Sequence, residues 1–136
     1  MQIDFTLQNI DDAASYFLKK IGQQKVIALH GQMGVGKTTL LYSIGKLLGV
    51  AEPISSPTFS IINQYTTTAG QLLYHLDLYR IKDVQEAIDA GVEDCLYSEQ
   101  LCFVEWPEVL PTLLPSHTLH CYLSIIDERT RRLVIE

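Results

Sequence analysis

A short apolar segment followed by a glycine-rich turn constrains the fold of this chain more than any other feature. Residues 26–29 read Val-Ile-Ala-Leu, which is apolar and β-branched enough for a buried strand. Gly31, Gly34 and Gly36 follow at once, and apolar residues at helical spacing begin at Leu40. The sequence therefore predicts a strand that runs into a tight loop and then into a helix. This order is typical of proteins in which helices alternate with parallel strands.

Residues 31–38 have the spacing of a phosphate-binding loop, which is glycine, four residues, then glycine, lysine and threonine. Glycines let the backbone N–H groups turn inward around phosphate oxygens, and the following helix directs its positive end at the same anion. In such a loop Lys37 contacts the β- and γ-phosphates, and the Thr38 hydroxyl is a ligand of Mg²⁺. We therefore expect a bound nucleotide with Mg²⁺.

ATP is favoured over GTP because the chain has no guanine-reading Asn-Lys-x-Asp motif. The residues predicted to contact the nucleotide lie in the loop or directly after it: Gly31, Gly34, Val35, Gly36, Lys37, Thr38 and Thr39.

Two acidic residues stand where such a loop needs a partner for its metal ion, at the end of a neighbouring buried strand. Glu105 follows the apolar run 101–104, and Asp77 follows the run 72–76. His75 is two residues before Asp77, so both lie on one face of a strand. We predict that Glu105 and Asp77 hold the metal or act on the attacking water, with Lys37 as a third catalytic group. The alternative for each carboxylate is an ordinary surface position.

Several other residues have two interpretations. Trp106, the single tryptophan, is either a core or rim aromatic or a neighbour of the nucleotide. Thr58 is either a switch threonine that senses the γ-phosphate or a turn residue. Arg131 and the segment 6–9 are candidates for holding the adenine base. The histidines without a recognisable partner pattern are expected to be structural: His30, His117 and His120.

The remaining pattern predicts an α/β fold of the phosphate-loop NTPase type, with three layers and a parallel core sheet to which antiparallel strands are added. Residues 1–136 are expected to form a single domain. The helices are predicted over 10–21, with Asn9 as N-cap and Gly22 as terminator, over 37–48, ending at Gly49, and around 84–88, ending at Gly91. An edge strand is predicted over 2–7, and buried strands are predicted over 26–29 and 101–104. Two hairpins are also predicted, one that pairs 59–65 with 72–76 and one that pairs 119–126 with 131–135.

Composition narrows the function classes. Three cysteines without paired spacing favour a reducing compartment, so we expect a cytoplasmic protein in which Cys102 and Cys121 are small core residues. No apolar run is long enough for a membrane span, so no membrane association is expected. The formal net charge of −6 argues against a protein that grips nucleic acid unaided.

Four segments together are similar to one family: GQMGVGKTT at 31–39, SPTF at 56–59, YHLDLYR at 74–80 and EWPE at 105–108. The chain resembles TsaE (also called YjeE), the small ATPase of bacterial tRNA threonylcarbamoyladenosine synthesis. The segments occur in the family's order and extend over most of the chain. The family loop usually reads Gly-Asp-Leu-Gly-Ala-Gly-Lys-Thr-Thr, whereas this chain has Gln32, Met33 and Val35 at the three differing positions.

The resemblance implies a magnesium-dependent ATPase that is weak alone and works with the TsaD and TsaB subunits. In the family, ATP binding and hydrolysis reset that complex between rounds of threonylcarbamoyl transfer to tRNA. The resemblance also implies that Lys37 binds phosphate, that Thr38 and Glu105 hold or position Mg²⁺, that Asp77 supports metal or water, and that Trp106 lies beside the site. The tRNA would be contacted mainly by the partners, and the isolated protein is expected to be monomeric.

Two other functions use the same loop. A small metabolite kinase needs arginines that screen the transferred phosphoryl group. Between the loop and the C-terminal hairpin the sequence offers Arg80 alone. A nucleotide-sensing module that never hydrolyses ATP is the second alternative, which Glu105 disfavours.

Overall fold

The computed structural model describes residues 1–54 and 60–136, and within them seven strands form one mixed sheet in the order β1-β7-β6-β2-β5-β4-β3. The strands are β1 (Gln2–Thr6), β2 (Val26–His30), β3 (Ile62–Thr66), β4 (Leu72–Asp77), β5 (Leu101–Glu105), β6 (Leu119–Ile125) and β7 (Thr130–Ile135). The central strands β6, β2, β5 and β4 pair in parallel. Antiparallel strands β7 and β1 extend one side and β3 the other. This is the predicted parallel core with added antiparallel strands.

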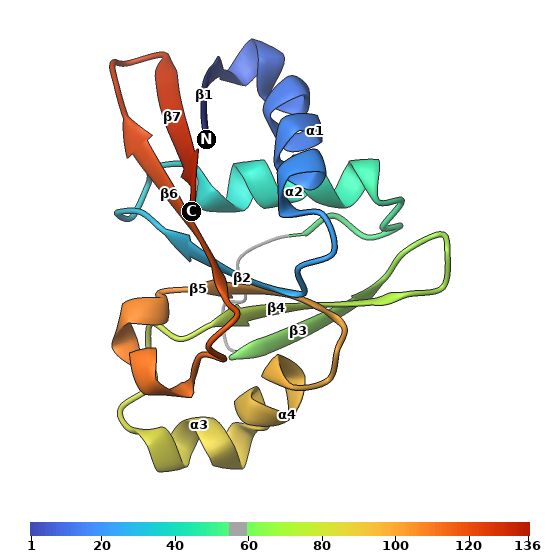
Figure 1. Ribbon diagram of the computed structural model, residues 1–136, viewed down its shortest axis with the longest axis vertical. Coiled ribbons are helices and arrows are strands. Elements are labelled where there is room, and N and C mark those ends of the chain that lie inside the picture. Colours follow the sequence, from blue (N-terminus) through green and yellow to red (C-terminus); the bar gives the residue numbers. More distant parts are fainter. Residues whose placement is uncertain (55–59) are drawn as a thin grey trace.

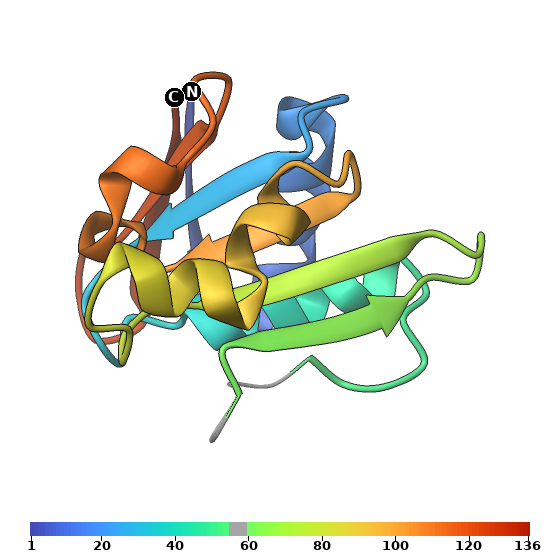
Figure 2. The same ribbon diagram turned by 90° about the horizontal axis from the view of Figure 1, so that it is seen from below.

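Helices cover both faces of the sheet, which gives the predicted three layers (Figure 1). On one face lie α1 (Ile10–Ile21) and α2 (Lys37–Leu47). On the other lie α3 (Val84–Ala90) and α4 (Val92–Leu96), which cross the strands in the view of Figure 2. Three short 3₁₀ helices complete the described elements: η1 (Leu7–Asn9), η2 (Pro107–Val109) and η3 (Pro111–Leu113).

Two apolar cores lie on the two faces of the sheet, because alternate residues of each strand point to opposite sides. In β5, Phe103 packs into the core under α1 and α2, whereas Cys102 and Val104 pack under α3 and α4. Phe17 of α1 is fully buried against Phe103, with ring centroids 5.9 Å apart. Cys102 and Cys121 are fully buried, as predicted for small core residues.

Most described helix and strand boundaries lie within one or two residues of the expected ones, but the start of β3, helix α4 and the Asn9 cap differ from expectation. In the described part of the chain β3 begins at Ile62, and Phe59, where a strand was expected to begin, lies outside the described residues. Helix α4 was not expected, because Gly91 reads as a terminator. Gly91 (φ 93°) is the C-cap of α3 and the N-cap of α4 at once. Asn9 occupies the expected N-cap position, but its side chain accepts a hydrogen bond from the Thr6 N–H (2.6 Å).

Among the described residues, no helix has the length and apolar character needed to cross a membrane.

Replacing Phe17 by alanine tests the contact between α1 and the sheet. The free energy of unfolding of the variant should be about 3–5 kcal/mol lower, because a large buried ring is lost and a cavity remains. Urea denaturation followed by circular dichroism measures the change. Leu47→Ala on α2 is the matched control, since the Leu47 side chain is half exposed. Equal losses in the two variants would contradict this account of the core.

Candidate nucleotide-binding site

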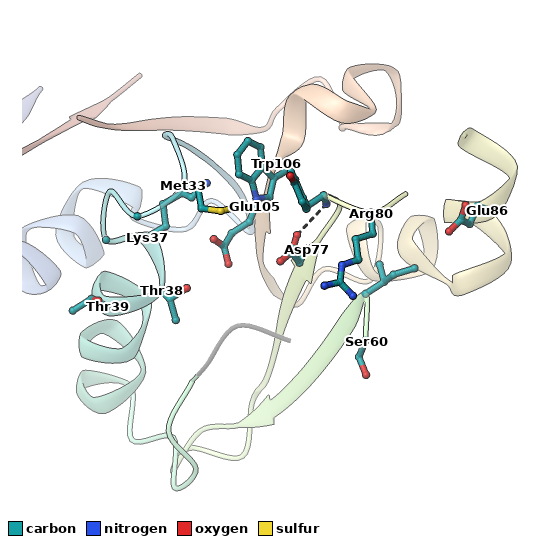
Figure 3. A pocket seen from close by; sticks show the side chains of 14 residues that line it. Met33, Lys37, Thr38, Thr39, Ser60, Asp77, Arg80, Glu86, Glu105 and Trp106 are labelled. Atoms are coloured by element: carbon teal, nitrogen blue, oxygen red, sulfur yellow. Dashed lines mark hydrogen bonds between the residues drawn. The ribbon is translucent and has the colours of Figure 1, made fainter. Parts of the chain in front are cut away.

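The carboxyl ends of β2, β5 and β4 meet the amino end of α2, and a cavity of about 630 Å³ opens there. This is the place where ligands bind in parallel α/β sheets. Figure 3 shows Thr38 of α2, Glu105 of β5 and Asp77 of β4 around the same space. The cavity contains most of the predicted site residues: Gly34, Gly36, Lys37, Thr38, Thr39, Asp77, Glu105 and Trp106. Met33, Tyr79, Arg80 and Glu86 are among the other lining residues.

The loop between β2 and α2 depends on glycine at two places for different reasons. Gly36 has φ 108°, a left-handed conformation that most residues avoid, and it is the N-cap of α2. A Cβ at Gly31 would lie 2.9 Å from the backbone oxygen of Leu123 and 2.8 Å from Cγ1 of Val35. The backbone of β6 therefore passes too close for any side chain at position 31.

Lys37, the first residue of α2, is held on the inner side of the loop. Its Nζ donates a hydrogen bond to the Gly31 carbonyl (2.6 Å) and lies 4.0 Å from the centre of the Trp106 ring. Lys37 is 6% exposed, and burial lowers the pKa of its ammonium group, an effect opposed by Glu105, Glu108 and Asp77. A desolvated cation at the amino end of a helix is suited to a phosphate.

The two predicted carboxylates lie side by side at the ends of adjacent strands. Asp77 of β4 and Glu105 of β5 are directly paired in the parallel register, so their side chains lie on the same face of the sheet. Glu105 is 4% exposed, and its Oε2 lies 2.5 Å from Nε2 of the fully buried His75. Oδ1 of the half-buried Asp77 accepts a hydrogen bond from the Tyr79 N–H (3.0 Å), drawn as a dashed line in Figure 3.

Trp106 leaves β5 in a left-handed conformation (φ 57°) that is uncommon for a residue with a side chain. This turn carries the indole over Lys37, and the indole also contacts the Tyr79 ring, at a centroid distance of 4.9 Å. The strained backbone places Trp106 at the rim of the cavity, where it also packs against the core under α3 and α4. Its contact with a nucleotide stays a prediction.

Arg131 lies on the opposite side of the loop. Its Nε donates a hydrogen bond to the Val35 carbonyl (3.0 Å), which ties β7 to the loop. It also lines a second cavity of about 760 Å³, together with Val35 and the segment 5–8. Gly34, Gly36 and Thr39 border both cavities, so the loop separates two spaces. The predicted base-binding candidates are thus brought together on one flank of the loop.

His30 and His120 contact each other, although the sequence indicated a partner for neither of them. His30 Nε2 and His120 Nδ1 are 2.8 Å apart, and the His30 ring stacks on Tyr122 with centroids 4.4 Å apart. His30 Nδ1 also lies 3.4 Å from a carboxylate oxygen of Glu108. Burial, followed by the nearby His120, lowers the pKa of His30. The pairing joins parallel strands β2 and β6, which no local sequence pattern reveals.

Thr58, the candidate switch threonine or turn residue, lies outside the described residues.

The oxygen-bearing side chains at the cavity fit a hard divalent cation that is also bound by phosphate oxygens of a nucleotide. Within the described ranges, no three or more His, Cys, Asp or Glu side chains are arranged to hold a metal ion by themselves. Thr38, Asp77 and Glu105 provide oxygen atoms at one cavity, which suits Mg²⁺ completed by phosphate oxygens and water.

Comparison with known proteins identifies the family. A family model described as threonylcarbamoyl adenosine biosynthesis protein TsaE matches residues 6–133. The chain belongs to the TsaE family. The tRNA threonylcarbamoyladenosine biosynthesis protein TsaE of Treponema pallidum is 32% identical over 111 residues, which cover 81% of this chain and 80% of that protein. The corresponding protein of Nostoc is 42% identical over 114 residues, which cover 79% of this chain and 67% of that protein.

A solved structure confirms the α/β fold. The crystal structure of Bacillus subtilis YdiB matches with a TM-score of 0.73, covering 99% of this chain and 84% of that chain at 23% identity. The resemblance read from the four segments is therefore confirmed at the level of family and fold, and TsaE membership places the chain in tRNA threonylcarbamoyladenosine biosynthesis.

Replacing Gly31 by alanine tests the close approach of β6 to the loop. The added methyl would force the loop away from the Leu123 carbonyl, and overpacking of this kind costs about 1–3 kcal/mol. Thermal unfolding measures the loss. The control is Gln32→Ala at the exposed neighbouring position, which should leave stability nearly unchanged. An unchanged melting temperature for Gly31→Ala would show that the loop does not depend on this contact.

Proposed function

We propose that this chain binds ATP with Mg²⁺ in the 630 Å³ cavity and hydrolyses it in tRNA threonylcarbamoyladenosine biosynthesis. The observation that carries the proposal is the position of Lys37, which is buried at the start of α2 and lines one cavity with the paired carboxylates Asp77 and Glu105. Positive and negative groups thereby meet in the same cavity. A nucleotide phosphate tail with its cation requires this arrangement.

In the proposed mechanism, water attacks the γ-phosphate in line with the departing ADP oxygen. Lys37 and the loop N–H groups offset the negative charge of the transferred phosphoryl group. Glu105 or Asp77 accepts a hydrogen bond from the attacking water and orients it. The Thr38 hydroxyl and a carboxylate would hold Mg²⁺, which supplies charge neutralisation between the phosphates when it is bound.

The second cavity is the proposed place for adenine. It adjoins the loop at Gly34, Gly36 and Thr39, so a nucleotide whose phosphates occupy the loop can extend its base in this direction. The cavity is lined by Phe5 and Leu7 as well as by Arg131, so it offers apolar surface for a purine ring and polar groups for its edges.

We further propose that TsaD and TsaB are the partners whose cycle the hydrolysis resets, and that the activity is weak without them. Family membership supports this step, and so does the rim of the cavity, where Met33 and Tyr79 expose 68% and 52% of their surfaces. Apolar side chains beside a polar cavity provide surface that a partner can cover. We propose a monomer in the cytoplasm that contacts tRNA through these partners, which agrees with its net charge of −6.

Trp106 provides a direct test of ATP binding. It is the single tryptophan, and its indole faces the Lys37 ammonium. Phosphate bound at Lys37 alters the charge beside the ring, so titration with ATP and Mg²⁺ should change the tryptophan emission to a saturable plateau. Lys37→Ala should abolish the titration, whereas Lys46→Ala, at an exposed position on α2, should retain it. Calorimetric binding without any fluorescence change would contradict the placement of Trp106.

Phosphate release tests hydrolysis, and Lys46→Ala is again the control variant. Lys37→Ala and Glu105→Gln should each lower phosphate release by about 100-fold or more, because each removes a charged group from the reacting centre. The assay compares the chain alone with the chain plus TsaD and TsaB, and turnover should rise in the complex. Normal hydrolysis in both variants would overturn the mechanism. Binding without turnover in the complex would favour a sensing module, and a phosphorylated metabolite would favour a kinase.

A further inference from the structure

The pair formed by His75 and Glu105 is not explained by phosphate-loop chemistry. The His75 side chain in β4 is fully buried, and its Nε2 lies 2.5 Å from Oε2 of Glu105 in β5. The pair lies on the α1 and α2 face of the sheet, where the neighbouring strand positions are occupied by Leu73 and Phe103. An apolar residue at position 75 would suit these neighbours, so the histidine has to be explained by what its ring donates.

The proton can be assigned from the contact. A carboxylate only accepts hydrogen bonds, so the hydrogen lies on Nε2 of His75 and the ring donates to Glu105. Nδ1 is buried and has no hydrogen-bond partner within the described part of the chain. An unpaired buried nitrogen is unfavourable. His75 bears this cost at Nδ1, while Nε2 on the opposite side of the ring forms the short hydrogen bond to Glu105.

The contact fixes the direction of the Glu105 carboxylate. Oε2 is engaged by His75 at the base of the site, so Oε1 is the oxygen that Glu105 can offer to the cavity. Asp77, two residues after His75 on the same strand face, stands directly beside Glu105 in the register. Figure 3 shows the Glu105 carboxylate directed into the space between Thr38 and Asp77. One strand therefore supplies both the second carboxylate and the donor that orients the first.

We propose that His75 is a positioning residue that holds Glu105 in the orientation needed to support Mg²⁺ and the attacking water. The inference rests on the proposed ATPase function and adds a residue that acts through another. Groups that orient metal-supporting carboxylates set metal affinity, and their loss typically weakens it about 10- to 100-fold. The magnesium-dependent part of nucleotide binding should therefore depend on His75, and the magnesium-free part should not.

The first experiment measures the affinity of the full chain for the non-hydrolysable analogue AMP-PNP by calorimetry, with Mg²⁺ and with EDTA. His75→Leu keeps the volume but removes the donor, and it should reduce the strengthening by Mg²⁺ about 10-fold while leaving the affinity in EDTA unchanged. His75→Gln, whose amide N–H can reach Glu105, should restore most of the difference. His75→Asn, which retains an amide on a shorter side chain, should not.

Leu73→Ala is the matched control, because Leu73 is fully buried on the same face of the same strand. It should lower thermal stability without altering the effect of Mg²⁺. Should His75→Leu fail to fold, the comparison of Gln with Asn decides the question. Equal weakening with Mg²⁺ and with EDTA, or equal behaviour of the Gln and Asn variants, would overturn the positioning role and leave a structural one.

The second experiment uses turnover with TsaD and TsaB. His75→Leu should lower kcat more than it raises KM, and in a Glu105→Gln background it should cause no further loss, because the residue acts through Glu105. Independent losses would contradict the proposal. Failure of the wild-type chain to hydrolyse ATP would remove the proposed function, but the calorimetry would still decide on His75. A wild-type affinity that does not respond to Mg²⁺ would overturn the positioning role itself.

Discussion

The parallel pairing of β2, β5 and β4 is the constraint on which the site depends. It aligns the carboxyl ends of three strands that are separated along the chain, so that Leu29 is level with Glu105 and Glu105 is level with Asp77. The loop that leaves β2 then faces both carboxylates across a single cavity. A shift of one residue in either pairing would turn the side chains to the opposite face of the sheet. Apolar packing on both faces therefore determines the site geometry as well as the stability.

Much of this arrangement follows from local patterns in the sequence. The apolar run 26–29, the glycine spacing and the helical periodicity after Lys37 predict β2, the loop and α2. Glu105 and Asp77 are found because each ends an apolar run, and strand ends are where parallel sheets collect functional groups. The brief helix α4 is missed because five residues carry too little periodicity, and because Gly91 serves two helices at once.

Contacts between distant residues could not be predicted in the same way. His75 and Glu105 are 30 positions apart, His30 and His120 are 90 apart, and Arg131 and Val35 are 96 apart. Each contact requires the strand order and register, which a single sequence does not contain. The sequence does place His75 on the same strand face as Asp77, and this was the available signal that His75 belongs with the site. Its bond to Glu105 emerged only from the pairing of β4 with β5.

The backbone at Trp106 places stability and site geometry in opposition. A left-handed conformation costs a residue with a side chain about 1–2 kcal/mol relative to an ordinary turn, and glycine would avoid that cost. Glycine would also remove the indole that covers Lys37. The fold therefore accepts a local penalty to keep an aromatic surface against the lysine, a trade-off common where a binding site constrains the backbone. The chain is for this reason not optimised for stability at the point where β5 ends.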